Sequence, residues 1–420
     1  MVADTSSRNG TSYRTLAIVA FLCVLLLIAG ASAKPIPITG PTVITSPGQY
    51  YIASGVTNST APIYIEVQAS NVYIDGRGKV IDGSDADESI GIKIYSSAMS
   101  LVNVVVKNLV LNDWGTALWM TDVKNSLLDK VTASSSLGNG ILLGNCIGNT
   151  VQNSVLQDNG DCGMIIYGSS ASNTLEKITV QRNGGDGIRI RLSHDNLLQN
   201  NKILNNIGPG INLDQGNYNT LLKNTITGNG GMGITLYKAS YNQITQNTLK
   251  DNYNGIYLIT ESFNNDLYQN TVTCSTYNGI YLNTGADDNV IHGNTVDNNL
   301  FGLVIRQADA NVFFDNKVRN NGQAGVWLWD SNHNVLYNNY FYNINNTNLI
   351  GTSSNTWNLT LSEQKSITGG KFSGGNSWGQ PNGQGFSQVT PDSNRDGICD
   401  NSFVMAVNNV DWLPLKYKKV

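Results

Sequence analysis

The pentapeptide NGIYL at residues 254–258 recurs letter for letter at residues 278–282. A shorter word, a glycine followed by an aliphatic, a variable and an aliphatic residue, is repeated along most of the chain. Its copies begin at Gly91, Gly140, Gly163, Gly187, Gly210, Gly233, Gly255, Gly279, Gly302 and Gly325, with a degenerate copy at Gly115. Neighbouring copies lie 22 to 25 residues apart, and a fixed period of this length indicates a repeat architecture.

A second word has the same period: an asparagine followed two residues later by an apolar residue. Apolar residues alternate with polar or aromatic ones on both sides of it, which is typical of half-buried strands. One period therefore consists of short strands separated by turns. The repeated asparagines are Asn201, Asn224, Asn247, Asn270, Asn294, Asn316 and Asn339.

These patterns predict an all-β fold, a right-handed parallel β-helix with about 11 coils of about 23 residues. Leucine-rich repeats have a similar period, but here β-branched windows are broken every few residues by Gly or Asn. We expect the repeated Asn to form a sharp corner, because Asn tolerates the left-handed backbone conformation. Its amide can also hydrogen-bond the equivalent Asn of the next coil, which makes a ladder.

The N-terminus has the order of a secretory signal. Arg8 and Arg14 precede an apolar run from Leu16 to Ala31, and small residues end at Ala33. An uncleaved membrane anchor is the alternative, because the run approaches spanning length. No second hydrophobic span follows in the sequence, so we expect a secreted or cell-surface protein without a membrane span after signal removal.

The chain divides into the signal (1–33), an N-terminal cap with the first β coils (34–89), the β-helix (90–345) and a C-terminal cap or tail (346–420). Both flanks are expected to cover the open ends of the strand stack. Charged residues make up 13% of the chain and the net charge is −4. No basic run gives electrostatic support for binding nucleic acid.

Several stretches together are similar to a known family. They are PGQYYIAS (47–54), NVYIDGRGKVIDG (71–83, read as strand–turn–strand), the glycine and asparagine coils, and NSW, DSNRDGICD and NVDWLPL in the tail. The chain resembles exported β-helix proteins of the NosD type and of the carbohydrate-binding and sugar-hydrolase (CASH) group, which are abundant among archaeal surface proteins. The resemblance implies the fold, but the group spans sugar-active enzymes and a copper-delivery accessory protein.

The copper role can be tested on the histidines. Copper prefers imidazole or sulfur ligands that converge. His194 and His292 lie four coils apart, about 19 Å along the axis, and His333 is out of register with both. The histidines are therefore interpreted as turn residues facing solvent.

The tail resembles the front of a calcium loop, with Gly397 at the position of the sharp turn. Position 12 is Phe403 in place of a bidentate Glu, so another group must complete the shell, and Asp411 is one candidate. An acidic glycine turn without an ion is the alternative. The expected structural calcium ligands are Asp392, Asn394, Asp396, the Ile398 carbonyl and Asp400.

Outward side chains of the glycine strands are expected to form columns along one face. Flat rings stack on sugars, and arginines bind hydroxyl or carboxylate groups. The alternative is that aromatic residues are simply good strand residues. The expected polysaccharide-binding residues are Arg189, Arg191, Tyr237, Tyr257, Tyr281, Arg306, Trp327 and Trp329.

Catalysis has weaker support in the sequence. A glycoside hydrolase needs two carboxylates about 5–10 Å apart, and Asp214 has no acidic partner in its column. Arg191 with Tyr237 is the one arrangement that fits a uronan lyase or epimerase, and GIRIR (187–191) resembles a basic strand of such enzymes. We therefore expect a β-helix that binds extended polysaccharide or acts in the cell envelope. The alternatives are a uronate lyase or epimerase, a copper accessory protein and a purely structural envelope protein.

Overall fold

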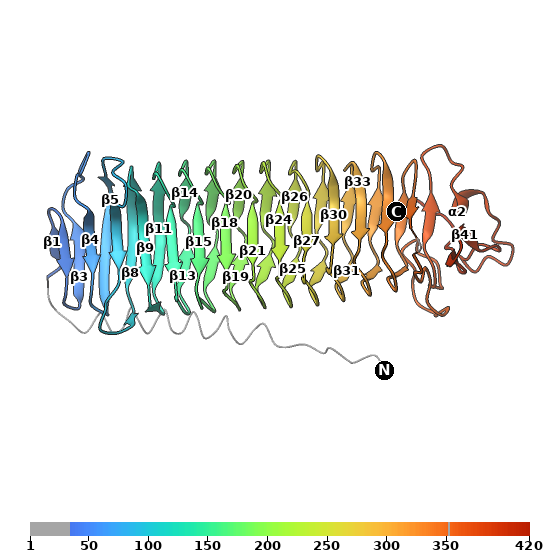
Figure 1. Cartoon of the computed structure of the whole chain (residues 1–420), viewed down its shortest axis with the longest axis horizontal. Helices are drawn as coiled ribbons and strands as arrows, with labels where there is room; N and C mark the ends of the chain where they lie inside the picture. Colours follow the sequence, from blue (N-terminus) through green and yellow to red (C-terminus); the bar gives the residue numbers. More distant parts are fainter. Residues whose placement is uncertain (1–33, 352) are drawn as a thin grey trace.

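The structure, a computed structural model, describes residues 34–351 and 353–420. The expected signal segment 1–33 lies outside the described residues. The chain winds into a long right-handed parallel β-solenoid with about 13 turns, two more than the sequence predicts. Residue 34 lies at one end of the rod and the C-terminal tail covers the other (Figure 1).

Each coil contributes one strand to a 14-stranded parallel sheet. Its strands carry the glycine words, and their burial alternates between inward and outward side chains. The strands are β2 (Thr42–Ile44), β4 (Ile63–Val67), β6 (Ile90–Ile94), β9 (Thr116–Thr121), β12 (Ile141–Gly144), β15 (Met164–Tyr167), β18 (Ile188–Arg191), β21 (Ile211–Asp214), β24 (Ile234–Tyr237), β27 (Ile256–Ile259), β30 (Asn278–Asn283), β33 (Phe301–Arg306), β36 (Ala324–Trp329) and β39 (Thr347–Ile350).

The other two strands of each coil belong to a 24-stranded sheet that is bent at the asparagine corner. The second strands are β13 (Thr150–Gln152), β16 (Thr174–Glu176), β19 (Leu197–Gln199), β22 (Thr220–Leu222), β25 (Gln243–Thr245), β28 (Asp266–Tyr268), β31 (Val290–His292), β34 (Val312–Phe314) and β37 (Val335–Tyr337). The third strands are β14 (Val155–Gln157), β17 (Thr179–Gln181), β20 (Lys202–Leu204), β23 (Thr225–Thr227), β26 (Thr248–Lys250), β29 (Thr271–Thr273), β32 (Thr295–Asp297), β35 (Lys317–Arg319), β38 (Tyr340–Tyr342) and β40 (Ser377–Gly379).

In the first coils the second and third strands are mostly fused. The stretch expected as strand–turn–strand is one strand, β5 (Val72–Asp82), with a register shift between Asp75 and Lys79 in place of the turn. Arg77 at this bulge has a φ of 54°. The strands of this end are β1 (Ile36–Ile38), β3 (Gly48–Ile52), β5 (Val72–Asp82), β8 (Val105–Asn112) and β11 (Leu127–Ser134), with a small sheet of β7 (Leu101–Val102) and β10 (Val123–Lys124).

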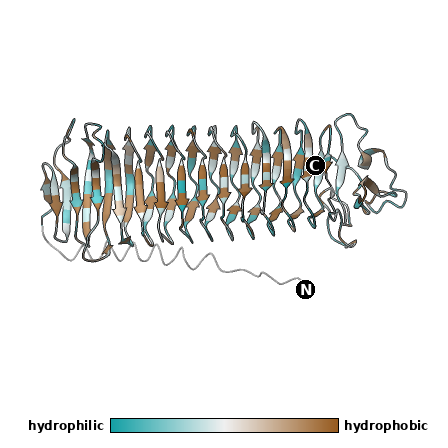
Figure 2. Cartoon of the chain, in the orientation of Figure 1, coloured by the Kyte–Doolittle hydropathy of each residue, from teal (hydrophilic) through white to brown (hydrophobic). Residues whose placement is uncertain are grey.

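Aliphatic side chains from all three strands fill the interior of each coil. In one coil, Ile256, Leu258, Leu267 and Val272 are all 0% exposed. Each such burial contributes about 1.5–3 kcal/mol of hydrophobic stabilisation. Figure 2 shows the resulting alternation of hydrophobic and hydrophilic residues along the strands.

The expected asparagine ladder is present, and it is one of three. Asn224 donates through its amide to Oδ1 of Asn247, which repeats the contact with Asn270. A second ladder precedes the second strands and includes Asn219, and a third follows the third strands and includes Asn229. All three ladders are buried, so each bend of the coil is held by stacked amides.

The expected reason for Asn at the corner is wrong in one respect. The ladder residue does not adopt the left-handed conformation; the residue before it does, as Lys223 (φ 55°) and Gln246 (φ 56°) show. The left-handed residue makes the bend and exposes its side chain. The following Asn then points inward, where its amide pairs with backbone and side-chain groups.

The C-terminal segment packs on the last coils. It contains α2 (Phe386–Val389) and a hairpin of β41 (Phe403–Ala406) and β42 (Asn409–Asp411). The buried Trp378 of β40 stacks on Phe341 at a centroid distance of 4.7 Å, and Tyr417 returns to Tyr340. Among the described residues, no helix is long and apolar enough to cross a membrane.

Candidate functional site

The outward side chains of the 14-stranded sheet between β18 and β36 form what we call the outward strip. Parallel register aligns them in two columns along the rod. One column runs through Arg189, Asn212, Thr235, Tyr257, Tyr281, Val304 and Trp327. The other runs through Arg191, Asp214, Tyr237, Ile259, Asn283, Arg306 and Trp329.

The N-terminal half of the strip is polar and open. Arg191, Asp214 and Tyr237 are direct neighbours in register on consecutive coils. Arg191 Nε lies 3.5 Å from Asp214 Oδ2, and the Arg191 side chain is 57% exposed. An ion pair this exposed contributes little to stability. The pair is therefore available to a ligand at small cost.

Arg189 is held more firmly by a residue that the sequence analysis missed. Its Nε donates to Oδ2 of Asp186 at 2.7 Å, and Asn212 donates to the same oxygen at 2.9 Å. Burial is the largest single influence and opposes the charge, but the hydrogen bond to Asp186 and the negative charge of Asp186 and its neighbours together raise the pKa of Arg189 above its ordinary value. Asp186 is 3% exposed and directly precedes Gly187. The sequence feature that could have identified Asp186 is its position directly before the repeated glycine, Gly187.

The C-terminal half of the strip is aromatic, and its rings pack on one another. Tyr257 and Tyr281 stack at a centroid distance of 4.8 Å, and Asn283 donates to the Tyr257 hydroxyl at 3.0 Å. Burial raises the pKa of Tyr257 above its usual range. Much of the ring surface that was expected to meet a sugar is thus used within the protein.

The tryptophans show the same self-packing. Phe301, which the sequence analysis did not single out, packs on Trp327 at 4.8 Å, and Trp327 packs on Trp329 at 6.0 Å. The guanidinium of Arg306 lies over Trp329, 4.3 Å from its ring centre. Arg306 is therefore engaged in a cation–π contact within the strip.

Tyr237 differs from the other rings of the strip. It ends β24 with 39% of its surface exposed, between Asp214 on one coil and Ile259 on the next. Lys238 lies over its ring at 5.9 Å. Tyr237 with Arg189 and Arg191 is the part of the strip that offers both a ring and positive charge to solvent.

The acidic tail loop is closed by its own hydrogen bonds. The N–H groups of Asp396 and Gly397 donate to Asp392 at 3.1 and 3.0 Å, and Ser393 donates through its hydroxyl and N–H to Asp400. The contact with Ser393 lowers the pKa of Asp400. Within residues 34–351 and 353–420, no three His, Cys, Asp or Glu side chains are grouped as a metal site.

Asp411 does not complete this loop, contrary to expectation. It is fully buried, and its Oδ2 accepts the N–H of Asn376 at 2.8 Å and the Trp378 indole N–H at 2.9 Å. Asn376 is itself the last member of the ladder that contains Asn339. Asp411 therefore caps the asparagine ladder. These hydrogen bonds within the cap account for the buried carboxyl group of Asp411 without a metal ion.

His194 and His333 are exposed, as expected, but the interpretation of His292 as a solvent-facing turn residue is wrong, because His292 ends strand β31 and its side chain is 22% exposed. His194 contacts Asp195 at 2.9 Å on an exposed turn, and His292 contacts Asp266 at 3.0 Å within a stack of rings. Cys146, Cys162, Cys274 and Cys399 are unpaired. Burial raises the pKa of Cys146 to about 12, so this thiol is inert at neutral pH.

Right-handed parallel β-helices form one class of solenoid, and two family descriptions match this chain. "Right handed beta helix region" matches residues 56–184 and 116–272, together just over half of the chain, and "Periplasmic copper-binding protein (NosD)" matches residues 267–383. The chain belongs to the right-handed β-helix proteins, and its C-terminal part is similar to the NosD family. A search of curated proteins found no match.

Several solved structures are similar to this chain, and one of them has a TM-score above 0.5. The A-module of the Azotobacter vinelandii mannuronan C-5 epimerase AlgE6 is 17% identical with a TM-score of 0.56, and the match covers 71% of this chain and 94% of that one. The periplasmic alginate epimerase AlgG is 13% identical with a TM-score of 0.40, covering 70% and 78%. The Dettilon tailspike protein is 14% identical with a TM-score of 0.42, covering 80% and 64%.

Proposed function

We propose that the protein is an exported β-helix that binds an extended acidic polysaccharide along the outward strip. One observation carries the proposal: Arg191, Asp214 and Tyr237 lie in register on consecutive coils, with Arg191 and Tyr237 exposed. Coils repeat at about 4.8 Å, so the strip presents equivalent positions along a straight line. A linear polymer meets such a surface more fully than a compact ligand does.

The charges favour an acidic polymer. Arg189 keeps its guanidinium fixed through Nε and Asp186, at the edge of the same open region as Arg191. A planar guanidinium pairs with carboxylates in a bidentate manner, and Tyr237 supplies a ring that can stack on a sugar. The aromatic half from Tyr257 to Trp329 then acts chiefly as a rigid floor.

A uronan lyase or epimerase is the second candidate, favoured by the same three residues. Arg191 can neutralise a uronate carboxylate, and Asp214 or Tyr237 can accept the proton released from the adjacent carbon. The fold relative with a TM-score of 0.56 is named a mannuronan C-5 epimerase. At 17% identity that likeness concerns the fold alone. The argument for catalysis therefore rests on Arg191, Asp214 and Tyr237.

One experiment separates these functions. Purified protein is run through gels containing polymannuronate, polygalacturonate or neutral glucan, and the polymers are analysed for unsaturated ends and for epimerised residues. Retardation by the acidic polymers without new products supports the binding function. New products assign the lyase or epimerase. Equal mobility in all gels, with unchanged polymers, overturns both in favour of a structural envelope protein.

We also propose that the tail loop binds one structural calcium ion. Asp392, Asn394, Asp396 and Asp400 supply oxygen ligands at alternating positions, and Gly397 has a φ of 91° at the turn. Asp392 already accepts two loop N–H groups, which orders the loop around its carboxylate. Calcium would fix the tail on the last coils. Residues 1–33 are proposed to direct export.

A further inference from the structure

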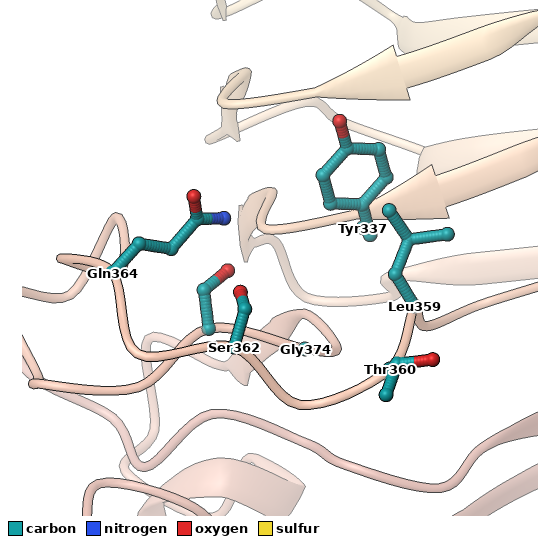
Figure 3. Close-up of a pocket in the computed structure, with 7 residues that line it drawn as sticks. Tyr337, Leu359, Thr360, Ser362, Gln364 and Gly374 are labelled. Carbon is teal, nitrogen blue, oxygen red and sulfur yellow. The ribbon is translucent and has the colours of Figure 1, made fainter. Parts of the chain in front are cut away.

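A cavity of about 320 Å³ lies at the C-terminal end of the rod, away from the outward strip. It forms where the segment 359–374 folds back over the end of the second-strand face (Figure 3). Its volume is at the lower end of the range for small-molecule sites, about 300–1,000 Å³. The residues that line it are Tyr337, Leu359, Thr360, Ser362, Gln364, Ser373 and Gly374.

Backbone pairing holds the walls in place. Ser362 and Ser373 donate N–H groups to each other's carbonyls at 2.9 and 3.0 Å, and the Leu359 N–H donates to the Gly374 carbonyl at 2.9 Å. The Ile367 N–H donates to Oδ1 of Asn338 on the coil below at 2.9 Å. The loop is therefore anchored on both sides, and the cavity exists without a ligand.

The two sides of the cavity differ in chemistry. Tyr337 and Leu359 lie on one side, and the amide of Gln364 and the hydroxyl of Ser362 lie across from them (Figure 3). Tyr337 ends a stack of four rings that begins at Tyr268, and Phe314 covers one side of it at 5.2 Å. None of the lining side chains is acidic or basic. The cavity is therefore amphipathic and neutral.

Ser373 lines the cavity, but its side chain is 1% exposed and its hydroxyl has no accessible surface that a ligand could contact. The polar side chains that a ligand in the cavity can reach are those of Ser362 and Gln364, which are not buried.

We propose that this cavity binds one neutral sugar ring. A pyranose has an apolar face of C–H groups and a rim of hydroxyls, which match the ring of Tyr337 on one side and the side chains of Gln364 and Ser362 on the other. A charged sugar is disfavoured, because no lining side chain pairs with a carboxylate. This site is distinct from the outward strip, and the inference does not depend on the function proposed for it.

The test uses ligand-observed saturation-transfer NMR on the full chain, followed by calorimetry of the sugar that binds. The probes are glucose, galactose, mannose and N-acetylglucosamine, their methyl glycosides, and glucuronate. We expect transfer to at least one neutral sugar and none to glucuronate. A methyl glycoside that binds as well as the free sugar assigns the site to a glycan chain end, and loss on methylation assigns it to a free monosaccharide.

Two variants connect binding to the cavity. Ser362→Ala and Gln364→Ala should each weaken the sugar about tenfold or more, which is about 1.4 kcal/mol, and both should keep the parent melting temperature because neither side chain is buried. Ser354→Ala is the matched control, because Ser354 is exposed and lies outside the cavity. Absence of transfer to every neutral sugar, or parent affinity in both Ser362→Ala and Gln364→Ala, overturns the proposal.

Discussion

The side-chain amide of Asn247 donates to Oδ1 of Asn270, one coil further on, at 3.0 Å. The backbone N–H of Asn247 donates to the same oxygen at 2.9 Å, and its amide also donates to the carbonyl of Leu221 on the coil before. One buried side chain therefore joins three coils. Since the relationship is repeated at three bends, the ladders fix the register of the stack as well as its corners.

Asn247→Ala should lower the free energy of unfolding by about 1–3 kcal/mol, because the carbonyl of Leu221 loses a buried donor and Asn224 loses its acceptor. Urea or thermal melts of both proteins measure the change. Thr248→Ala, on the exposed neighbour, is the control and should stay within about 0.5 kcal/mol. Melts of Asn247→Ala that overlay those of the parent would contradict a structural role of the ladder.

The bend should also be sensitive to substitution of Lys223, the residue directly before Asn224 of the ladder. Lys223 has a φ of 55° and is exposed, whereas Lys202 lies in the third strand β20 and is also exposed. Lys223→Val should destabilise by about 1–2 kcal/mol, because a β-branched residue is strained in the left-handed region. Lys202→Val should be neutral or slightly stabilising, since Val favours strands. Equal melting temperatures for the two variants would contradict the assignment of the bend to Lys223.

The sequence alone predicts the coil, its period and one ladder. Period-2 alternation and a fixed glycine spacing leave little freedom once strands must stack in parallel. The asparagines of the ladders through Asn219 and Asn229 are also periodic in the sequence, but periodicity alone does not distinguish a buried amide from an exposed turn asparagine. The bend was misplaced by one residue, because Asn suits both the left-handed and the buried role.

The site was less predictable for a physical reason. Strand register places Tyr257 beside Tyr281 and Trp329 beside Arg306, and the sequence shows that much. Whether a ring faces solvent or its neighbour depends on rotamers that respond to the adjacent coils. Asp186 was not predicted as a site residue because it lies outside the strands. The C-terminal cavity could not be predicted either, because it is formed by a loop that is not part of the repeat.

The cap should make stability depend on pH. Burial raises the pKa of Asp411 from 3.8 to about 7, although hydrogen bonds from Asn376 and Trp378 oppose the shift. Between these values the folded chain holds a proton that the unfolded chain has lost, so stability should fall as the pH rises from about 4 to about 7. Asp411→Asn should lower stability and flatten this dependence. Melts across this pH range check it, and parallel curves for the two proteins would contradict the shifted pKa.

Calcium should stabilise the tail by mass action. Calorimetric titration of the full chain should show about one binding event, and the melting temperature should fall in chelator. Asp396→Asn should abolish both effects, because it removes a charged ligand from the centre of the loop. Asp251→Asn, an exposed acid far from the tail, is the control. Absence of heat, together with a melting temperature unchanged by chelator, would discard the site.

The outward strip should separate affinity from stability. Tyr237→Ala and Arg191→Ala alter exposed groups, so both should weaken the retention of acidic polysaccharide several-fold while the melting temperature stays within about 2 °C of the parent. Tyr257→Ala and Trp329→Ala remove packed rings instead. They should destabilise the protein by about 1–3 kcal/mol, because each ring stacks on a neighbour within the chain.

All four variants should be compared in affinity and in stability, because the two variants in one half of the strip are controls for the two in the other half. Affinity electrophoresis in polymannuronate and thermal melts are measured on the same preparations, and Lys202→Ala on the opposite sheet serves as a charge control for Arg191→Ala. Parent affinity in Arg191→Ala and Tyr237→Ala, with binding lost in Trp329→Ala at unchanged stability, would move the binding surface to the aromatic half. Ring faces that are now stacked on neighbours would then have to open for the ligand.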